Sequence, residues 1–135
     1  MLKTAYVPWT PMKIILEPYY FDFFGQCVKI PAGYAFDGLS IPRELQWLVN
    51  MNETQNQEAG LEHDFLYSKL SEKISSKIDS DYHLRYRVKC SKFRATIIFL
   101  WVDYFWKSSY RTDSNYIKYE KEIKNLRKKL WITKN

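Results

Sequence analysis

The chain has 135 residues, of which 46% are hydrophobic and 18% aromatic, and its formal net charge is +6. A chain of this size and composition buries enough apolar surface to fold as one domain without disulfides or a structural metal, which excludes a disordered protein. Residues 1–81 carry 7 Lys or Arg against 11 Asp or Glu, whereas residues 82–135 carry 14 against 4. The basic half can contact nucleic acid, acidic lipid headgroups or an acidic partner, although a solvated face is the commoner explanation.

The sequence indicates neither a membrane anchor nor a disulfide framework. Residues 1–11 lack the apolar run of a signal peptide, and the most apolar run, 95–106, is about half the length that a membrane span requires. Cys27 and Cys90 are far apart, and no histidine lies near either at zinc-finger spacing. We therefore expect a soluble protein without a transmembrane segment, made in a cytoplasm, with two reduced and partly buried thiols.

Short antiparallel strands are expected between residues 13 and 36, in the segments KIILE, YYFDFF, QCVKI and YAF. These segments are rich in β-branched and aromatic residues and are interrupted by glycine and proline. Phe24 and Gly25 lie where a hairpin turn would fall, and Pro31 with Gly33 would end the following strand.

Helices are expected in the rest of the chain. Asp37 and Gly38 supply a turn, Ser40 can cap a helix over 41–49, and Pro42 falls in its first turn. The polar segment 50–57 is a loop or a slow start to the next helix. Further helices are predicted over residues 58–70, 77–106 and 116–131, the last of them amphipathic and basic.

One stretch, EHDFLY at residues 62–67, brings together residue types that carry chemistry. On a helix, His63 and Tyr67 share a face and Asp64 lies about 100° away. Ser76 and Asp79 resemble a capping box, so the next helix would return antiparallel and bring Asp81 near His63.

A neutral histidine oriented by a carboxylate can take a proton from water, and a neighbouring carboxylate can bind a hard cation such as calcium. Such a set would hydrolyse esters or phosphoesters. The alternative is that His63 is a hydrogen-bonded structural residue. For His83 we expect a surface or packing role, and Asp79 is assigned to the helix cap.

The segments IPAGYAFDGLSIPR and HDFLY, followed by an aspartate-bearing helix, resemble a family of small proteins encoded by bacteriophages and prophages and catalogued as a domain of unknown function. The family pattern PAGFxTDGxSIPR, AAxxHDxLY and ADxxF corresponds to Pro31–Arg43, Ala59–Tyr67 and Ser80–Leu84. The resemblance spans about residues 28–106. It implies a bacteriophage protein of the host cytoplasm or the virion, but names no reaction.

The same helix is loosely similar to that of secretory and parvovirus-type phospholipases, whose pattern resembles DxAAxxHDxxY followed by an antiparallel helix with an aspartate. This similarity implies that His63 is the general base, Asp81 orients it, and Tyr67 supports it by hydrogen bonding. Asp64 would be a ligand of calcium or another divalent cation, and Asp37 a further one. Gln57 replaces the first aspartate of that pattern, and the glycine-rich calcium loop is missing.

Two residues of the SIPR segment are candidate binding residues. For Ser40 the alternative is the helix cap. For Arg43 an ion pair with Asp37 or Glu44, which would fix the turn, is preferred to binding an oxyanion.

We therefore expect an α+β fold in which a small N-terminal antiparallel β-sheet packs on a helical hairpin, with a basic amphipathic C-terminal helix. Residues 1–110 would form a single domain, with the helix of 111–135 appended to it. The first functional hypothesis is a calcium-dependent ester or phosphoester hydrolase. The second is a non-catalytic phage structural or host-interaction protein that meets a phage or host protein or an acidic lipid surface. The third, nucleic-acid binding, is not favoured because no motif supports it.

Overall fold

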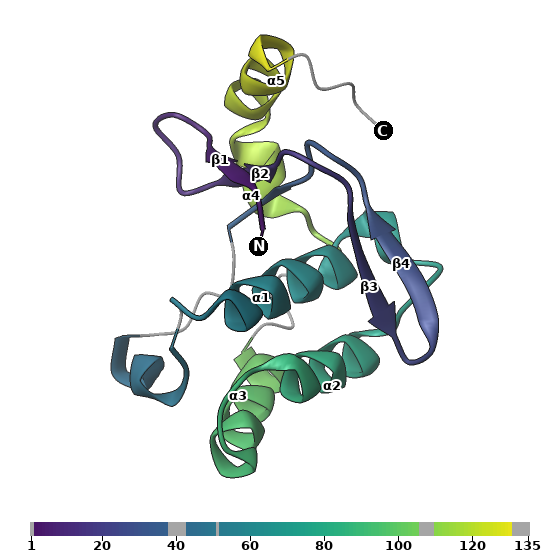
Figure 1. The fold of residues 1–135 in the computed structure, drawn as a ribbon, viewed down its shortest axis with the longest axis vertical. Helices are drawn as coiled ribbons and strands as arrows, with labels where there is room; N and C mark the ends of the chain where they lie inside the picture. Colours follow the sequence, from purple (N-terminus) through teal and green to yellow (C-terminus); the bar gives the residue numbers. More distant parts are fainter. Residues whose placement is uncertain (1, 38–42, 51, 106–109, 131–135) are drawn as a thin grey trace. The chain divides into compact units, whose positions relative to one another are not determined.

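The structure is a computed structural model that describes residues 2–37, 43–50, 52–105 and 110–130. It is α+β, as predicted, with short antiparallel strands in the N-terminal part and a helical hairpin (Figure 1). The chain folds into two compact units. Unit 1 combines residues 1–37 with residues 114–135, and unit 2 comprises residues 38–113.

The first sheet of unit 1 has the order β1-β2-β5, and both pairs of strands are antiparallel. Its strands are β1 (Thr4–Tyr6), β2 (Lys13–Ile15) and β5 (Ala35–Phe36). The prediction began at Lys13 and missed β1. This strand is three residues long and half-exposed, so its sequence shows too little alternation to predict a strand.

The second sheet is the hairpin of β3 (Tyr19–Phe23) and β4 (Gln26–Ile30). The predicted turn at Phe24 and Gly25 is confirmed, with φ of 49° and 86°. Two consecutive residues with positive φ are typical of the tight hairpin turn whose twist matches that of the flanking strands. Side chains alternate along the strands, so that one face of the hairpin is buried and the other is exposed.

The C-terminal part of unit 1 is divided into α4 (Ser114–Lys118) and α5 (Glu120–Lys129), where one helix over 116–131 was predicted. Tyr119 separates them, with φ −112° and ψ 21°. Ile123 is buried among the side chains of the first sheet, whereas Ile117 is exposed.

Unit 2 is helical, and its helices share an apolar core. They are η1 (Arg43–Leu48), α1 (Thr54–Tyr67), η2 (Lys69–Ser71), α2 (Lys77–Arg87) and α3 (Lys92–Phe105). The core cluster takes side chains from η1 and from all three α-helices, and these are Leu48, Val49, Ala59, Tyr67, Leu84, Val88, Ala95, Ile98 and Val102. The described part of the helix predicted from residue 41 is a 3-10 helix.

Helix α1 begins at Thr54, four residues before the predicted start, and ends at Tyr67, three residues before the predicted end. The polar segment that precedes the apolar residues is therefore the start of the helix. Asn56 explains why a polar sequence can be helical here. Its side chain is fully buried, donates to the Asn50 carbonyl at 2.8 Å and accepts from the Lys89 amide at 2.6 Å.

The single helix predicted over residues 77–106 is wrong, because the chain breaks between α2 and α3. Val88 is extended, with ψ 136°. The backbone groups that the break releases find partners on α1: Gln55 donates to the Arg87 carbonyl at 2.7 Å, and Asn56 accepts from the Lys89 amide. The Ser91 hydroxyl then accepts from the Arg94 amide at 3.2 Å, which caps the new helix.

Two further predictions concern a transmembrane segment and the two cysteines. Among the helices of the described residues, none combines the length and the apolar character that crossing a bilayer requires. Both cysteines are free, but only Cys90 is partly buried, and Cys27 is exposed. The prediction for Cys27 was wrong because this residue lies on the outward face of β4.

Candidate functional site

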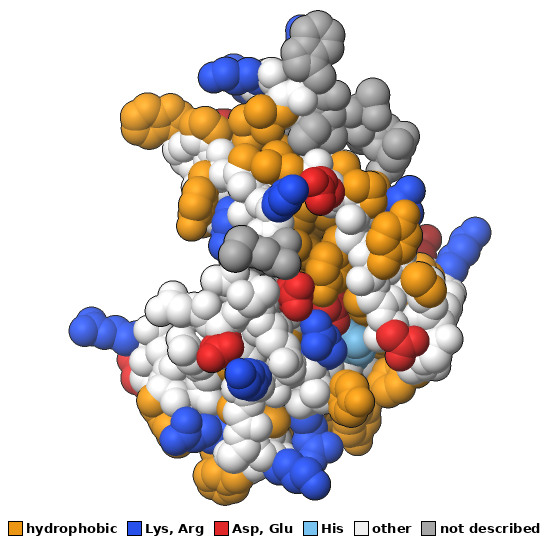
Figure 2. Space-filling model, viewed as in Figure 1, with side chains coloured by type: hydrophobic (Ala, Val, Ile, Leu, Met, Phe, Trp, Pro, Cys, Tyr) orange, Lys and Arg blue, Asp and Glu red, His pale blue; other side chains and the backbone are white. Residues whose placement is uncertain are grey.

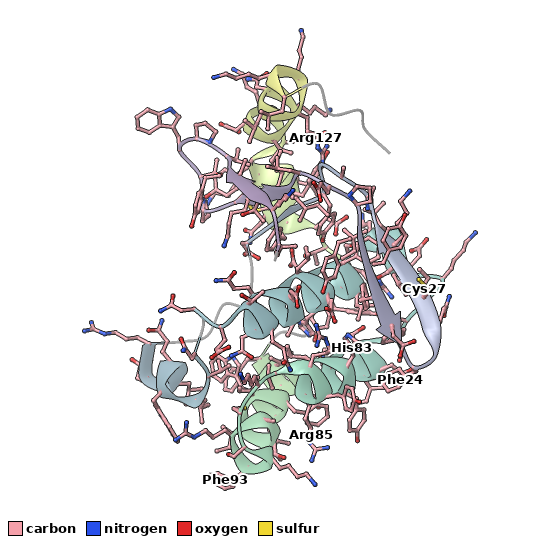
Figure 3. All side chains as sticks on the ribbon, viewed as in Figure 1. Phe24, Cys27, His83, Arg85, Phe93 and Arg127 are labelled. Atoms are coloured by element: carbon pink, nitrogen blue, oxygen red, sulfur yellow. The ribbon has the colours of Figure 1, made fainter. Side chains whose placement is uncertain are left out.

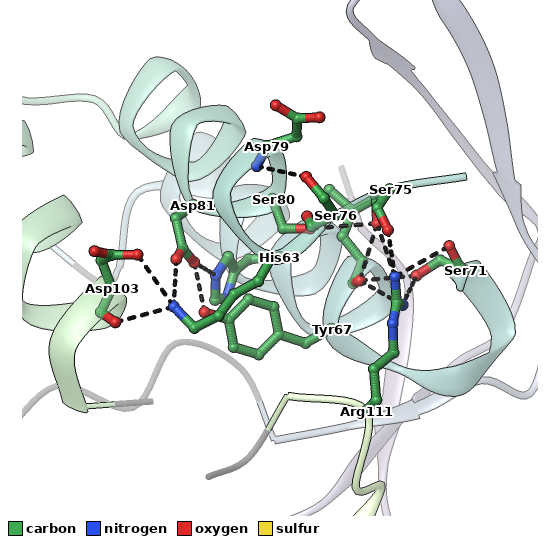
Figure 4. A network of polar contacts seen from close by, with 12 residues as sticks. His63, Tyr67, Ser71, Ser75, Ser76, Asp79, Ser80, Asp81, Asp103 and Arg111 are labelled. Carbon is green, nitrogen blue, oxygen red and sulfur yellow. Dashed lines mark hydrogen bonds and ion pairs between the residues drawn. The ribbon is translucent and has the colours of Figure 1, made fainter. Parts of the chain in front are cut away.

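The helical hairpin of α1 and α2 brings together the three residues that the sequence analysis named as catalytic. His63 and Tyr67 are four residues apart on α1, and their rings lie 4.2 Å from each other. Asp81 comes from α2, which begins at the Ser76 cap, where the hydroxyl accepts from the Asp79 amide. The predicted capping residue is thus confirmed, and the antiparallel return places Asp81 opposite His63 (Figure 4).

The Asp81 carboxylate is the centre of this cluster. His63 Nε2 lies 2.9 Å from Asp81 Oδ1, and the Tyr67 hydroxyl donates to the same oxygen at 2.6 Å. Only 1% of His63 and none of Asp81 is exposed to solvent. A buried carboxylate needs such donors, because desolvation of an unpaired charge is costly.

Lys77 completes the cluster and was not predicted. Its Nζ donates to Asp81 Oδ2 at 2.8 Å and to the Asp103 carbonyl at 3.0 Å, and lies 3.3 Å from Asp103 Oδ1. The spacing of Lys77 and Asp81, four residues apart on one helix, is the signal that could have found it. The contact with α3 could not have been found, because the predicted helix was continuous.

The surroundings set the charge of each group. Burial lowers the pKa of His63, and this effect outweighs the neighbouring Asp81 carboxylate, which raises it. Burial also raises the pKa of Asp81, but hydrogen bonds from His63, Lys77 and Tyr67 outweigh it, and the net pKa is lowered. Burial and the bond to Asp81 raise the pKa of Tyr67. Near neutral pH the cluster therefore contains a neutral imidazole, a carboxylate and a protonated phenol.

This charge state fixes the tautomer of His63. A neutral imidazole beside a carboxylate places its proton on the nitrogen that faces the carboxylate, so Nε2–H donates to Asp81 and the lone pair lies on Nδ1. An imidazole oriented in this way can act as a general base toward water. Because His63 is buried, water and substrate must reach Nδ1 through a local opening of the fold.

A second histidine–carboxylate cluster holds the same helical hairpin and was missed. His83 Nε2 lies 2.7 Å from Glu62 Oε1, and both side chains are buried between α1 and α2, as Figure 3 shows for His83. Arg87 donates from Nε and Nη2 to the two carboxylate oxygens of Glu62, at 2.9 Å each. His83 thus has a packing role, one of the two roles expected for it.

Arg111 holds the connection between the two helices from outside. Its guanidinium donates to the Leu66 carbonyl at 2.9 Å and to the Ser71 hydroxyl at 2.7 Å, and also to the carbonyls of Ser68 and Ser75. These carbonyls lie in the last turn of α1 and in the connection to α2, where backbone acceptors lack helical partners. Figure 4 shows the guanidinium between Ser71 and Ser75. The sequence gives no signal for this contact, since it joins residues about 40 positions apart.

The two residues proposed as metal ligands belong to different units. Asp64 is half-buried on α1 in unit 2, whereas Asp37 belongs to unit 1. There the Asp37 carboxylate accepts from Asn115 Nδ2 at 2.6 Å, and burial raises its pKa, which disfavours the charged form that a hard cation requires. Within the described ranges, no group of three or more His, Cys, Asp or Glu side chains could hold a metal ion.

Of the two candidate binding residues of the SIPR segment, Ser40 lies outside the described residues. Arg43 is the first residue of η1 and is exposed. The described part of the chain shows no ion pair between Arg43 and Glu44. The expectation that this ion pair fixes the turn before the helix is therefore not supported.

Comparison with known proteins gives one result. The sequence pattern of a family described as a protein of unknown function (DUF1353) matches residues 12–102. No curated protein and no solved structure matches the chain. The matched segment includes the hairpin of α1 and α2 with both histidine clusters.

Proposed function

We propose that this chain, which belongs to the DUF1353 family of proteins of unknown function, is a hydrolase of carboxylic or phosphate esters in which His63 is the general base. The observation that supports the proposal is the contact of 2.9 Å between His63 Nε2 and Asp81, in a setting that keeps the imidazole neutral. Family membership supplies no reaction, so the proposal rests on these side chains.

Each residue of the cluster has a distinct part in the proposed reaction. His63 Nδ1 takes a proton from water as the water attacks the ester carbon or phosphorus, and the resulting imidazolium returns that proton to the alcohol that leaves when the ester bond breaks. Asp81 holds the Nε2–H tautomer and stabilises the imidazolium that forms, and Tyr67 with Lys77 holds the carboxylate in place. A positioned base of this kind contributes roughly 100- to 10,000-fold to a rate.

One observation favours a second candidate function, a non-catalytic structural or host-interaction protein. The His63 cluster is buried, and a second buried cluster of Glu62, His83 and Arg87 joins the same two helices. Two such clusters can hold a helical hairpin together without any chemistry, since buried hydrogen-bonded groups contribute to a unique packing. The experiment below is designed to separate the two functions.

The test replaces His63 by glutamine, whose amide N–H can still donate to Asp81 but cannot act as a base. Hydrolysis of a soluble p-nitrophenyl ester, a p-nitrophenyl phosphodiester and dispersed phospholipid is measured for the purified chain. For at least one substrate, His63→Gln should reduce turnover by at least about 100-fold. The matched control, His83→Gln, changes the second cluster and should leave turnover within about three-fold.

The opposite result would be equally clear. If the wild-type chain hydrolyses none of the three substrates faster than His63→Gln does, the hydrolase proposal is wrong. A lower free energy of unfolding in both variants, without any turnover to lose, would then identify both histidines as structural residues.

Calcium dependence and bacteriophage origin are further proposals, supported only by the resemblance of HDFLY and DGLSIPR described above. Calcium binding through Asp64 should raise the melting temperature of the wild-type chain but not that of Asp64→Asn. A phage protein of the host cytoplasm or the virion should be detected by mass spectrometry in infected cells or in purified virions.

A further inference from the structure

Helix α3 is apolar on two opposite faces. Ala95, Ile98 and Val102 are buried in the core of unit 2. At about 100° per residue, Phe93, Leu100 and Tyr104 lie within about 40° of one another on the opposite face. Their exposed fractions are 70%, 58% and 68%. These three side chains are exposed because Ala95, Ile98 and Val102 occupy the inward face of the helix.

The exposed apolar surface continues onto α2 and η1. The ring of Tyr82 on α2 stacks on Phe99 of α3, with the ring centres 4.6 Å apart, and Tyr86 is 83% exposed. Trp47 of η1 is also exposed and lies under the Arg94 guanidinium. We call this surface the α2–α3 face, made of Trp47, Tyr82, Tyr86, Phe93, Leu100 and Tyr104. An exposed apolar patch of this kind marks an interaction site.

The segment of residues 82–102, which supplies most of the α2–α3 face, carries charges of one sign. Residues 82–102 contain five Lys or Arg and no Asp or Glu. One of the five, Arg87, forms an ion pair with the buried Glu62. The other four are exposed where α2 ends and α3 begins, and among them Lys89 also pairs with Glu53 at 3.6 Å. These four are Arg85, Lys89, Lys92 and Arg94. Figure 3 shows Phe93 at the outer end of α3, and Figure 2 shows hydrophobic and basic side chains together in the lower part of the molecule.

We propose that the α2–α3 face binds an anionic lipid surface. Tyrosine and tryptophan rings with polar edges, bordered by Lys and Arg, are the side chains that favour the boundary between headgroups and acyl chains. The exposed cations would lie against anionic headgroups, each strengthening binding. This proposal does not depend on the hydrolase proposal, because none of the six residues belongs to the His63 cluster.

Other binding partners would make favourable contacts with fewer of these side chains. In a symmetric dimer formed through this face, the four cations of one copy would meet the same four of the other. A nucleic acid would neutralise the cations and stack on the rings, but it offers no apolar partner to Leu100. An anionic bilayer accepts the cations, the rings and the aliphatic side chain together.

The test measures binding of the full chain to vesicles by flotation. Vesicles of phosphatidylcholine alone are compared with vesicles that contain about one-third phosphatidylglycerol, as an anionic lipid. The chain should bind the anionic vesicles, and salt should weaken the binding. Replacing both Tyr86 and Phe93 by serine should weaken it by at least about ten-fold. Lys92→Gln should weaken it by about five-fold.

Two matched controls come from unit 1. Phe24→Ser removes an exposed ring at the tip of the β3–β4 hairpin, and Lys121→Gln removes an exposed cation of α5. Both variants should bind as the wild-type chain does. All these residues are exposed, so the variants should keep the circular dichroism spectrum and melting temperature of the wild-type chain.

Four results would overturn the proposal. The first is that the wild-type chain does not bind anionic vesicles at low salt. The second is that the double serine variant binds as well as the wild-type chain, or no less well than the two controls. The third is that the chain is a dimer in light scattering, which Leu100→Ser dissociates, while vesicles are not bound. The fourth is that an oligonucleotide binds this face and lipid does not.

Discussion

His63 is neutral in this fold near neutral pH because its burial disfavours the imidazolium more than the Asp81 carboxylate favours it. The neutral form is the one that a general base requires, and it also suits a purely structural histidine. The pKa direction therefore does not distinguish the two functions. It does make the stability of the protein depend on pH in a definite direction.

Stability should fall as the pH is lowered below about 6.5, the ordinary pKa of histidine. Between that value and the lower pKa of folded His63, the unfolded chain takes up a proton that the folded chain does not, so acid favours unfolding. Asp81 adds a second loss below about pH 4, because its folded pKa is also lowered. Urea unfolding at several pH values should show both losses.

The variant His63→Gln serves as the control, since it removes the titrating group but keeps a donor to Asp81. Its free energy of unfolding should depend less on pH between about pH 6.5 and pH 5 than that of the wild-type chain. Nuclear magnetic resonance of the imidazole gives an independent measurement. A His63 that titrates at or above the ordinary value would contradict the prediction.

The sequence was sufficient to predict Asp81 and two of its partners, His63 and Tyr67, but not the complete cluster. His63 and Tyr67 share a helix face by spacing alone, and the Ser76 cap fixed where α2 begins, so Asp81 followed from an antiparallel hairpin. Lys77 and the buried Glu62 were missed. In the sequence both look like ordinary surface charges. Only the packing of neighbouring helices buries Glu62 and brings Lys77 to its acceptor on α3.

At the scale of the elements, the connections between helices are determined by contacts from distant residues. The α2–α3 break depends on Gln55 and Asn56, which bond to the backbone where the helix stops. The loop after α1 depends on Arg111, whose backbone amide also donates to the Tyr67 carbonyl at 2.7 Å. Helical periodicity does not report such contacts, since they are neither local nor periodic.

Replacing Arg111 by lysine tests the contact at the α1–α2 connection. Lysine keeps the charge but lacks the planar fork that reaches several carbonyls at once. The free energy of unfolding should fall by about 1–3 kcal/mol, because carbonyls after α1 lose their donor. Chemical unfolding measures this loss.

Arg85→Lys is the matched control for this substitution. Arg85 is exposed and makes one side-chain bond, from Nε to Thr96 at 3.2 Å. Its replacement should change the free energy of unfolding by less than about 0.5 kcal/mol. Equal effects of the two substitutions would show that the contact of Arg111 is not specific.

At the scale of the whole molecule, both ends of the chain contribute to one compact unit. Ile123 of α5 is fully buried beside Val7, Met12 and Ile14, which come from the first 14 residues. The basic helix is thus part of a core. Its cations cover the outer side, while its apolar residues pack on the first sheet.

Replacing Ile123 by alanine should therefore destabilise unit 1. A cavity at a fully buried isoleucine costs about 2–4 kcal/mol. Hydrogen exchange of the β1 and β2 amides measures the loss within that unit. Ile117→Ala, at an exposed position of α4, is the control and should change protection by less than about 0.5 kcal/mol. Unchanged exchange in Ile123→Ala would show that the C-terminal helix does not support the sheet.

The sequence by itself determined the local features of this protein: the α+β class, the Phe24–Gly25 turn, the cap at Ser76 and the face shared by His63 and Tyr67. Each follows from the conformational preferences or the spacing of a few neighbouring residues. Tertiary structure decided the rest, including the α2–α3 break, the second histidine cluster and the exposure of Phe93 and Leu100. These features depend on which helix faces meet. More than one face of α1 and of α3 could pack against a neighbour, and only the assembled core determines which face is buried.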